Sequence, residues 1–176
     1  MKKIAIVYQS VYGNTAIVAE HIRQGLELHG VEVSMIDIAH LRDVNQLTAY
    51  DGLILGAPTY MGSVPAQFKS FMDQTSSLWV KQAWSNKLCA GFTNSGGLSG
   101  DKFSVLTQIH TFASQHSMLW MPLGIPCTGN GESDLNRLGA STGLMTQSNN
   151  GKSPPSGDLE TARQFAQRFA QLVNRL

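Results

Sequence analysis

The chain has 176 residues, a formal net charge of +1 and 42% hydrophobic residues, which predicts one domain over residues 1–176 with a substantial core. Charged residues make up 14% and the basic ones are scattered, so we expect no nucleic-acid partner. Only a short apolar run follows Met1-Lys2-Lys3, and we therefore expect neither a signal peptide nor a membrane span.

Strand-like and helix-like segments alternate along the chain. Apolar runs predict strands at 4–8, 31–36, 53–57, 88–93 and 118–123. Helical periodicity predicts helices at 14–28 and 101–115 and a last one with Leu159, Ala162, Ala166, Phe169 and Val173 inward. Ser63 is a candidate cap of another helix, with Pro65 in its first turn. The five repeats predict an α/β fold with a doubly wound five-stranded parallel sheet of order 2-1-3-4-5.

A long, glycine-rich stretch at residues 124–157 has weak periodicity. A loop of that length in a compact domain is usually a functional lid, a binding surface or a mobile segment.

The first strand leads into the turn Ser10-x-Tyr-Gly13-Asn-Thr15, and good helix formers follow at once. A helix N-terminus presents unpaired N–H groups and the positive end of the helix dipole, which suits a phosphate. No Lys or Arg lies between positions 4 and 16, so backbone amides and the hydroxyls of Ser10 and Thr15 would hold the phosphate. The alternative is an ordinary turn with a helix cap.

Two further loops leave the carboxyl ends of predicted strands, where ligands bind in open parallel sheets. One contains residues 57–62 and the other residues 94–100. Their small residues and backbone groups allow close approach to a flat ring, and Tyr60 and Met61 offer apolar contact. In isolation, Pro58 and Gly62 would merely shape a turn.

The sequence contains no G-x-S-x-G elbow and no His/Asp/Glu cluster with metal spacing. These absences point away from hydrolysis and from a metal site. A bound redox ring would instead do the chemistry, with the protein supplying position and electrostatics.

Four motifs resemble those of flavodoxin-like FMN proteins, and most closely the WrbA-type NAD(P)H:quinone oxidoreductases. They are Ser10-x-Tyr-Gly-Asn-Thr15, Gly56-Ala-Pro-Thr-Tyr-x-Gly62, Phe71-x-Asp-Gln-Thr75 with Leu78-Trp79, and Phe92-Thr93. The resemblance implies a flavodoxin-like fold and bound FMN. It also implies hydride transfer from NAD(P)H through FMN to a quinone-like acceptor, and a homo-oligomer, either a dimer or a tetramer.

The resemblance also implies site residues. Ser10, Val11, Tyr12, Gly13, Asn14 and Thr15 would surround the FMN phosphate. Pro58, Thr59, Tyr60, Met61 and Gly62 would border the flavin ring. Thr93, Asn94, Ser95, Gly96 and Gly97 would contact its polar edge. Tyr12, Trp79 and His116 would contact substrates, with Trp79 reaching the site from a neighbouring subunit; no catalytic side chain and no metal are implied.

The chain departs from the WrbA pattern in two places. Residues 37–51 are too few to contain the extra segment that those proteins carry, and Asn14-Thr15 looks more like an ordinary flavodoxin. A flavodoxin-type electron carrier without its own turnover is therefore the alternative function. Electron-transfer flavodoxins are typically acidic, which the net charge of +1 does not match.

Structural interpretations stand beside the functional ones for several residues. Trp79 is a candidate interface anchor, and His116 a candidate helix-end residue. Cys89 and Cys127 lie far apart and cannot form a disulfide framework, which predicts a reducing, cytoplasmic location.

Overall fold

The computed structural model describes residues 1–148 and 153–176. Its elements follow the alternating order that the sequence predicts. They are β1 (Lys3–Tyr8), α1 (Asn14–Glu27), β2 (Glu32–Asp37), the 3-10 helix η1 (Val44–Ala49), β3 (Gly52–Pro58), α2 (Ala66–Gln74), α3 (Ser76–Val80), β4 (Leu88–Ser95), α4 (Lys102–Gln115), β5 (Leu119–Trp120), β6 (Leu144–Gln147) and α5 (Ser156–Val173).

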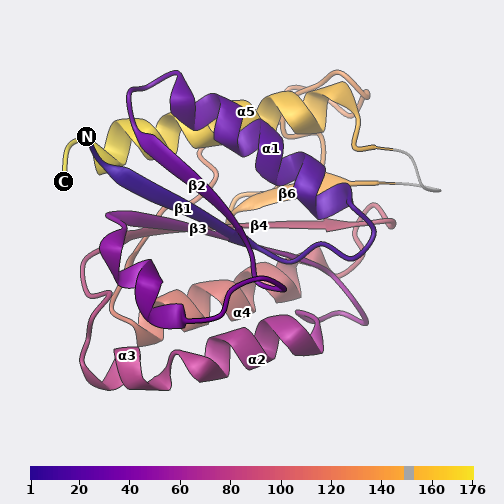
Figure 1. The fold of residues 1–176 in the computed structure, drawn as a ribbon. Helices are drawn as coiled ribbons and strands as arrows, with labels where there is room; N and C mark the ends of the chain where they lie inside the picture. Colours follow the sequence, from indigo (N-terminus) through magenta and orange to yellow (C-terminus); the bar gives the residue numbers. More distant parts are fainter. Residues whose placement is uncertain (149–152) are drawn as a thin grey trace.

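The strands form one parallel sheet in the order β2-β1-β3-β4-β5, with β6 also paired to β4. Helices α1 and α5 cover one face, while α2, α3 and α4 cover the other (Figure 1). The predicted α/β class and strand order are confirmed. Because all strands run in the same direction, their carboxyl ends meet at one end of the molecule, on the right in Figure 1.

Side chains of each strand alternate between two hydrophobic cores, as the two-residue period of a strand requires. Ile4 and Ile6 pack in the core beneath α1 and α5, whereas Ala5 and Val7 pack in the core above α2 and α4. Both cores contain fully buried aromatic side chains, with Phe165 and Phe169 in the first and Trp84 in the second. This burial on both faces explains the continuous apolar runs in the sequence.

Two strands share the edge of the sheet beside β4. β5 pairs only with the first residues of β4, at Leu88 and Cys89, and β6 pairs with residues 92–95. The prediction of one strand over 118–123 was therefore wrong. The chain leaves the edge at Pro122, which has no N–H to donate to a ladder, and returns as β6 from within the stretch predicted to be a loop.

Two other local expectations were also wrong. Ser63 does not cap α2, because its N–H and C=O both pair with Tyr60 at 3.0 Å in a tight turn, and Pro65 is the cap residue. The α4 helix begins at Lys102, one residue later than predicted. No described helix is both long and apolar enough to cross a membrane.

Candidate functional site

A pocket of about 470 Å³ lies where the three predicted loops meet at the carboxyl ends of the strands. Ten of the residues proposed from sequence line it, and Ser148 joins them. The lining consists of Val11, Tyr12, Asn14, Thr15, Pro58, Thr59, Tyr60, Asn94, Ser95, Gly96 and Ser148. None of these lining residues is charged, so an anion here would be held by N–H groups and hydroxyls.

The first loop leads into α1 without a side-chain cap on its N-cap residue, Gly13. Gly13 has a φ of 86°, a left-handed conformation that favours glycine. The hydroxyl of Ser10 accepts a hydrogen bond from the N–H of Ala16 at 3.1 Å, which fixes the loop against the helix. The first N–H groups of α1 at Asn14 and Thr15 remain directed out of the helix start, as the geometry of a helix N-terminus dictates.

The second loop turns sharply directly after β3. Met61 and Gly62 both have positive φ, at 48° and 72°, between the paired residues Tyr60 and Ser63. Met61 is fully exposed although its backbone is in a region that non-glycine residues rarely adopt. The Tyr60 ring lies edge-on to the Tyr12 ring, with centroids 6.3 Å apart. Partial burial raises the pKa of Tyr60, and the nearby Tyr12 raises it further.

The third loop is tied to the second by direct hydrogen bonds. The N–H of Thr59 donates to the carbonyl of Asn94 at 2.9 Å, and the Thr59 and Thr93 hydroxyls lie 2.8 Å apart. Thr93 is fully buried within β4, so it lies behind the pocket and does not line it. The Asn94 side-chain oxygen accepts hydrogen bonds from Thr146 at 2.8 Å and from Ser148 at 3.1 Å.

The pocket satisfies the requirements of an FMN-sized ligand. The uncapped start of α1 offers N–H groups to a phosphate, and the residues after β3 and β4 offer backbone groups and a tyrosine to a flat ring. Ser10, Gly13, Met61, Gly62 and Gly97 belong to the same three loops but do not line the pocket itself.

His116 and Trp79 lie away from this pocket within the chain. His116 ends α4 immediately before β5, which pairs with the beginning of β4, whereas the pocket is at the end of β4. Its ring is buried against Trp84 and accepts or donates one hydrogen bond with Thr75 at 2.9 Å. Trp79 lies on α3 and is 45% exposed. His116 is only 2% exposed, so its ring presents almost no surface to a substrate, whereas a substrate contact by Trp79 depends on a second subunit.

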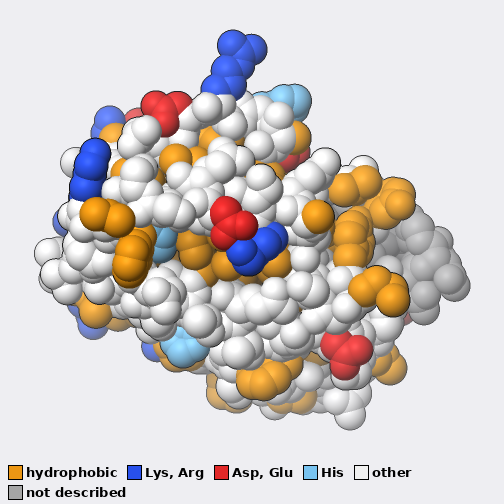
Figure 2. All heavy atoms as spheres, turned by 90° about the horizontal axis from the view of Figure 1, so that it is seen from below, with side chains coloured by type: hydrophobic (Ala, Val, Ile, Leu, Met, Phe, Trp, Pro, Cys, Tyr) orange, Lys and Arg blue, Asp and Glu red, His pale blue; other side chains and the backbone are white. Residues whose placement is uncertain are grey.

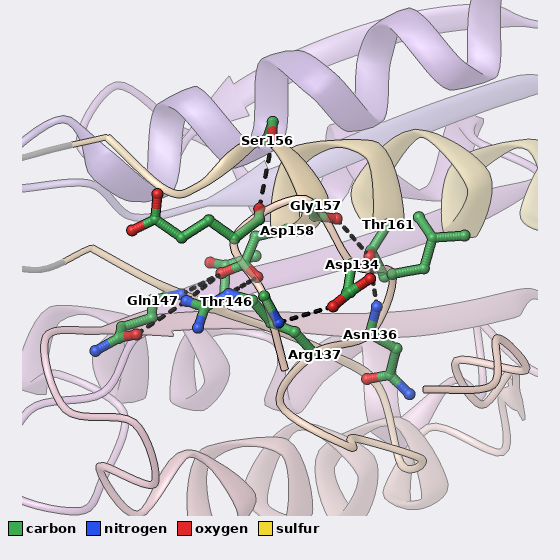
Figure 3. A network of polar contacts seen from close by, with 12 residues as sticks. Asp134, Asn136, Arg137, Thr146, Gln147, Ser156, Gly157, Asp158 and Thr161 are labelled. Atoms are coloured by element: carbon green, nitrogen blue, oxygen red, sulfur yellow. Dashed lines mark hydrogen bonds and ion pairs between the residues drawn. The ribbon is translucent and has the colours of Figure 1, made fainter. Parts of the chain in front are cut away.

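Sequence reasoning missed the residues that support the third loop. Lys102, Gln147 and Ser148 hydrogen-bond its carbonyl groups. Arg137 and Asp158 form an ion pair at 2.8 Å that is almost fully buried, and Asp158 also accepts from the N–H of Gln147 at 2.7 Å. Figure 3 shows Arg137, Gln147 and Asp158 pointing toward one another. No sequence motif marks these residues. Lys102 binds carbonyls four and five residues before it, whereas the contacts of the other residues join segments far apart in the chain.

The comparisons with known proteins agree with this fold. The sequence model of the family described as NADPH-dependent FMN reductase matches residues 42–132. Flavodoxin FldP of Pseudomonas aeruginosa (strain UCBPP-PA14) is 40% identical over 182 aligned positions, which cover all of this chain and 99% of that protein.

Solved structures are similar over nearly the whole chain. The flavodoxin, WrbA-like protein from Agrobacterium tumefaciens has a TM-score of 0.79 and 34% identity, with 99% of each chain covered. A flavodoxin from the domain Archaea has a TM-score of 0.73 and 22% identity, covering 98% of this chain and 99% of its own, which shows the fold alone. The chain therefore belongs to the flavodoxin-like family of FMN-binding redox proteins, and its cofactor is FMN.

Proposed function

We propose that the pocket holds FMN with its phosphate at the start of α1 and its ring between the second and third loops. The N–H groups of Asn14 and Thr15 would donate to the phosphate, together with the Thr15 hydroxyl. Pro58, Thr59 and Tyr60 border the same pocket from the second loop, and residues 94–96 border it from the third. The uncharged lining supports this placement, because a phosphate at a helix start needs no cation.

The proposed reaction is transfer of a hydride from NAD(P)H to bound FMN, followed by reduction of a quinone-like acceptor. FMN supplies the hydride-accepting ring, so no side chain need act as a nucleophile. The protein would position the ring, hold the phosphate and leave space for each substrate in turn.

One observation carries this proposal: the rim of the pocket is open and apolar. The three loops expose Val11 (56%), Tyr12 (81%), Met61 (102%) and Leu98 (65%). Figure 2 shows hydrophobic side chains gathered at the right-hand end of the molecule, the end at which the carboxyl ends of the strands lie. The third loop carries no aromatic residue that would cover a ring. A flat, neutral acceptor suits such an opening.

A second candidate function is that of an electron carrier. The name of the Pseudomonas relative, a flavodoxin, favours it. A carrier would exchange electrons with protein partners and would not turn over NAD(P)H by itself. Against it stands the net charge of +1, because long-range steering toward a basic partner needs an acidic surface. The family description, NADPH-dependent FMN reductase, supports the reductase.

Anaerobic addition of NADH or NADPH to the FMN-loaded protein tests the first half-reaction. We expect bleaching of the flavin absorbance, and then steady-state oxidation of NAD(P)H with benzoquinone in a ping-pong pattern, because both substrates use one exposed ring face. Protein without FMN is the control. If neither nucleotide reduces the bound flavin while dithionite does, the carrier function replaces the reductase.

We also propose a homo-oligomer in a reducing, cytoplasmic setting. Trp79 and the neighbouring Val80, 45% and 72% exposed on α3, would be anchors of a contact between subunits. If such a contact brings Trp79 to the acceptor, Trp79→Ala should raise the quinone KM in a way that depends on protein concentration. Sedimentation of the FMN-loaded protein measures the assembly directly.

A further inference from the structure

The connection between β4 and α4 is held through its carbonyl groups. The N–H of Ser148 donates to the carbonyl of Ser95 at 3.1 Å. The side-chain amide of Gln147 donates to the carbonyl of Gly96 at 2.9 Å. The ammonium of Lys102 donates to the carbonyls of Gly97 and, at 3.0 Å, of Leu98. Four successive carbonyl groups of the third loop are thus bound by donors from β6, from the residue after it and from the start of α4.

These carbonyl contacts determine where the loop's N–H groups point. The C=O of one residue and the N–H of the next share a peptide unit and point in opposite directions when that unit is trans. No described peptide bond is cis. With the carbonyls of residues 95–97 held by the protein, the N–H groups of Gly96, Gly97 and Leu98 face the other way. Among the described residues, none of these three N–H groups has a protein acceptor.

Lys102 differs from the other two donors because it carries a charge. Its side chain is 1% exposed, and the described part of the chain gives its ammonium no ion-pair partner. Arg137, the neighbouring cation, is already paired with Asp158 at 2.8 Å. Burial lowers the pKa of Lys102 to about 8, while the more distant Asp158 opposes that shift. At neutral pH the group therefore stays mainly protonated.

We propose that Lys102 is a positioning residue for the cofactor, which turns the N–H groups of the third loop toward FMN and places an uncompensated positive charge behind them. The proposal rests on the placement of this loop beside the flavin ring. Uptake of two electrons and one proton leaves the flavin ring with one more negative charge than its oxidised form. A buried cation and the aligned N–H groups stabilise that charge, so the protein should bind reduced FMN better, relative to oxidised FMN, than it would without Lys102.

The test compares Lys102→Met, Lys102→Gln and Lys102→Arg with the wild-type protein. Each is titrated with oxidised FMN, and the two-electron midpoint potential of the bound flavin is measured by dithionite reduction against a reference dye. We expect Lys102→Met to bind oxidised FMN more weakly and to have a more negative potential, with about a tenfold greater loss of affinity for reduced than for oxidised FMN. Lys102→Gln should resemble Lys102→Met in potential, and Lys102→Arg should restore it.

Two matched variants separate charge from structure. Lys81→Met removes an exposed lysine after α3, at the other end of the fold, and should match the wild type. Gln147→Met removes the uncharged donor to the Gly96 carbonyl, so it should weaken FMN binding but shift the potential less far in the negative direction than Lys102→Met does, because the charge of Lys102 remains. A Lys102→Met protein that folds and keeps the wild-type potential overturns the proposal, as does equal loss of affinity for both redox forms.

The wild-type protein provides a test that no folding defect can disturb. Hydrogen exchange at the N–H groups of Gly96, Gly97 and Leu98 should be rapid without FMN and should slow when FMN binds. Unchanged exchange at all three would show that they do not face the cofactor. Both measurements use FMN and dithionite alone. A failure of NAD(P)H or quinone turnover would therefore leave this proposal standing, and its failure would leave the reductase activity standing.

Discussion

The hydroxyl of Thr59 lies 2.8 Å from that of Thr93, and both side chains are buried. This contact joins the loop after β3 to the strand that leads into the third loop. The backbone bond from Thr59 to Asn94 runs beside it. Two walls of the pocket are thus fixed to each other by neighbouring strands.

Thr93→Val should leave the Thr59 hydroxyl without its partner and lower the free energy of unfolding by about 1–3 kcal/mol. The double variant Thr59→Val with Thr93→Val should lose less than the sum of the single variants, because neither hydroxyl is then left unpaired. Urea unfolding of the four proteins measures the coupling. Strict additivity would show that the two hydroxyls do not interact.

Gly13→Val should weaken FMN binding by about tenfold or more, since a branched side chain at the start of α1 would crowd the phosphate. Gly30→Val is the matched control. Both glycines have positive φ, 86° and 67°, and no heavy atom within 4 Å of an added Cβ, so both substitutions should cost about 1–3 kcal/mol in backbone strain. Gly30 precedes β2, at the opposite end of the sheet from the pocket. Equal FMN affinity in the two variants would place the phosphate elsewhere.

FMN should bind far more tightly than riboflavin, because several charge-assisted hydrogen bonds depend on the phosphate. Fluorescence titration of the cofactor-free protein with each flavin measures both dissociation constants. Equal constants would contradict phosphate binding at the start of α1.

Met61→Asn should stabilise the protein by up to about 1 kcal/mol, since asparagine tolerates a positive φ before glycine better than methionine does. The same change removes an exposed apolar side chain from the rim and should raise the quinone KM with little change in kcat. Thermal unfolding and steady-state kinetics on one preparation test both effects. A stabilised variant with unchanged KM would exclude Met61 from the acceptor site.

His116 should make the stability depend on pH. Burial lowers its pKa from the ordinary value of 6.5, so the folded protein keeps it neutral. As the pH falls, the unfolded chain binds a proton at His116 before the folded chain does. The contribution of neutral His116 to stability is therefore full above pH 6.5 and is lost as the pH falls below it. His116→Gln should show a shallower fall between pH 7 and 5. His21, whose pKa is also lowered chiefly by burial, stays in both proteins. Identical slopes would mean that His116 does not titrate in this range.

Much of this protein could be predicted from local patterns in the sequence. Buried strands appear as continuous apolar runs, and the motif from Ser10 to Thr15 marks a strand, a turn and a helix start within one short segment. The strand order follows from repeated β-α units and their handedness. Because carboxyl ends of parallel strands meet at one edge, the sequence alone also predicted that the three loops lie close together.

Only the tertiary structure decided which donors face the third loop from behind. Lys102 carries no motif, although the carbonyls that it binds are only four and five residues away. Gln147 and Arg137 also carry no motif, and their contacts depend on β6 taking the edge position beside residues 92–95 of β4. That position becomes free because the chain leaves the sheet at Pro122. Hydrogen bonds between segments so far apart depend on register and packing, which local propensity does not encode, and the support of the cofactor loop was therefore visible only in the folded chain.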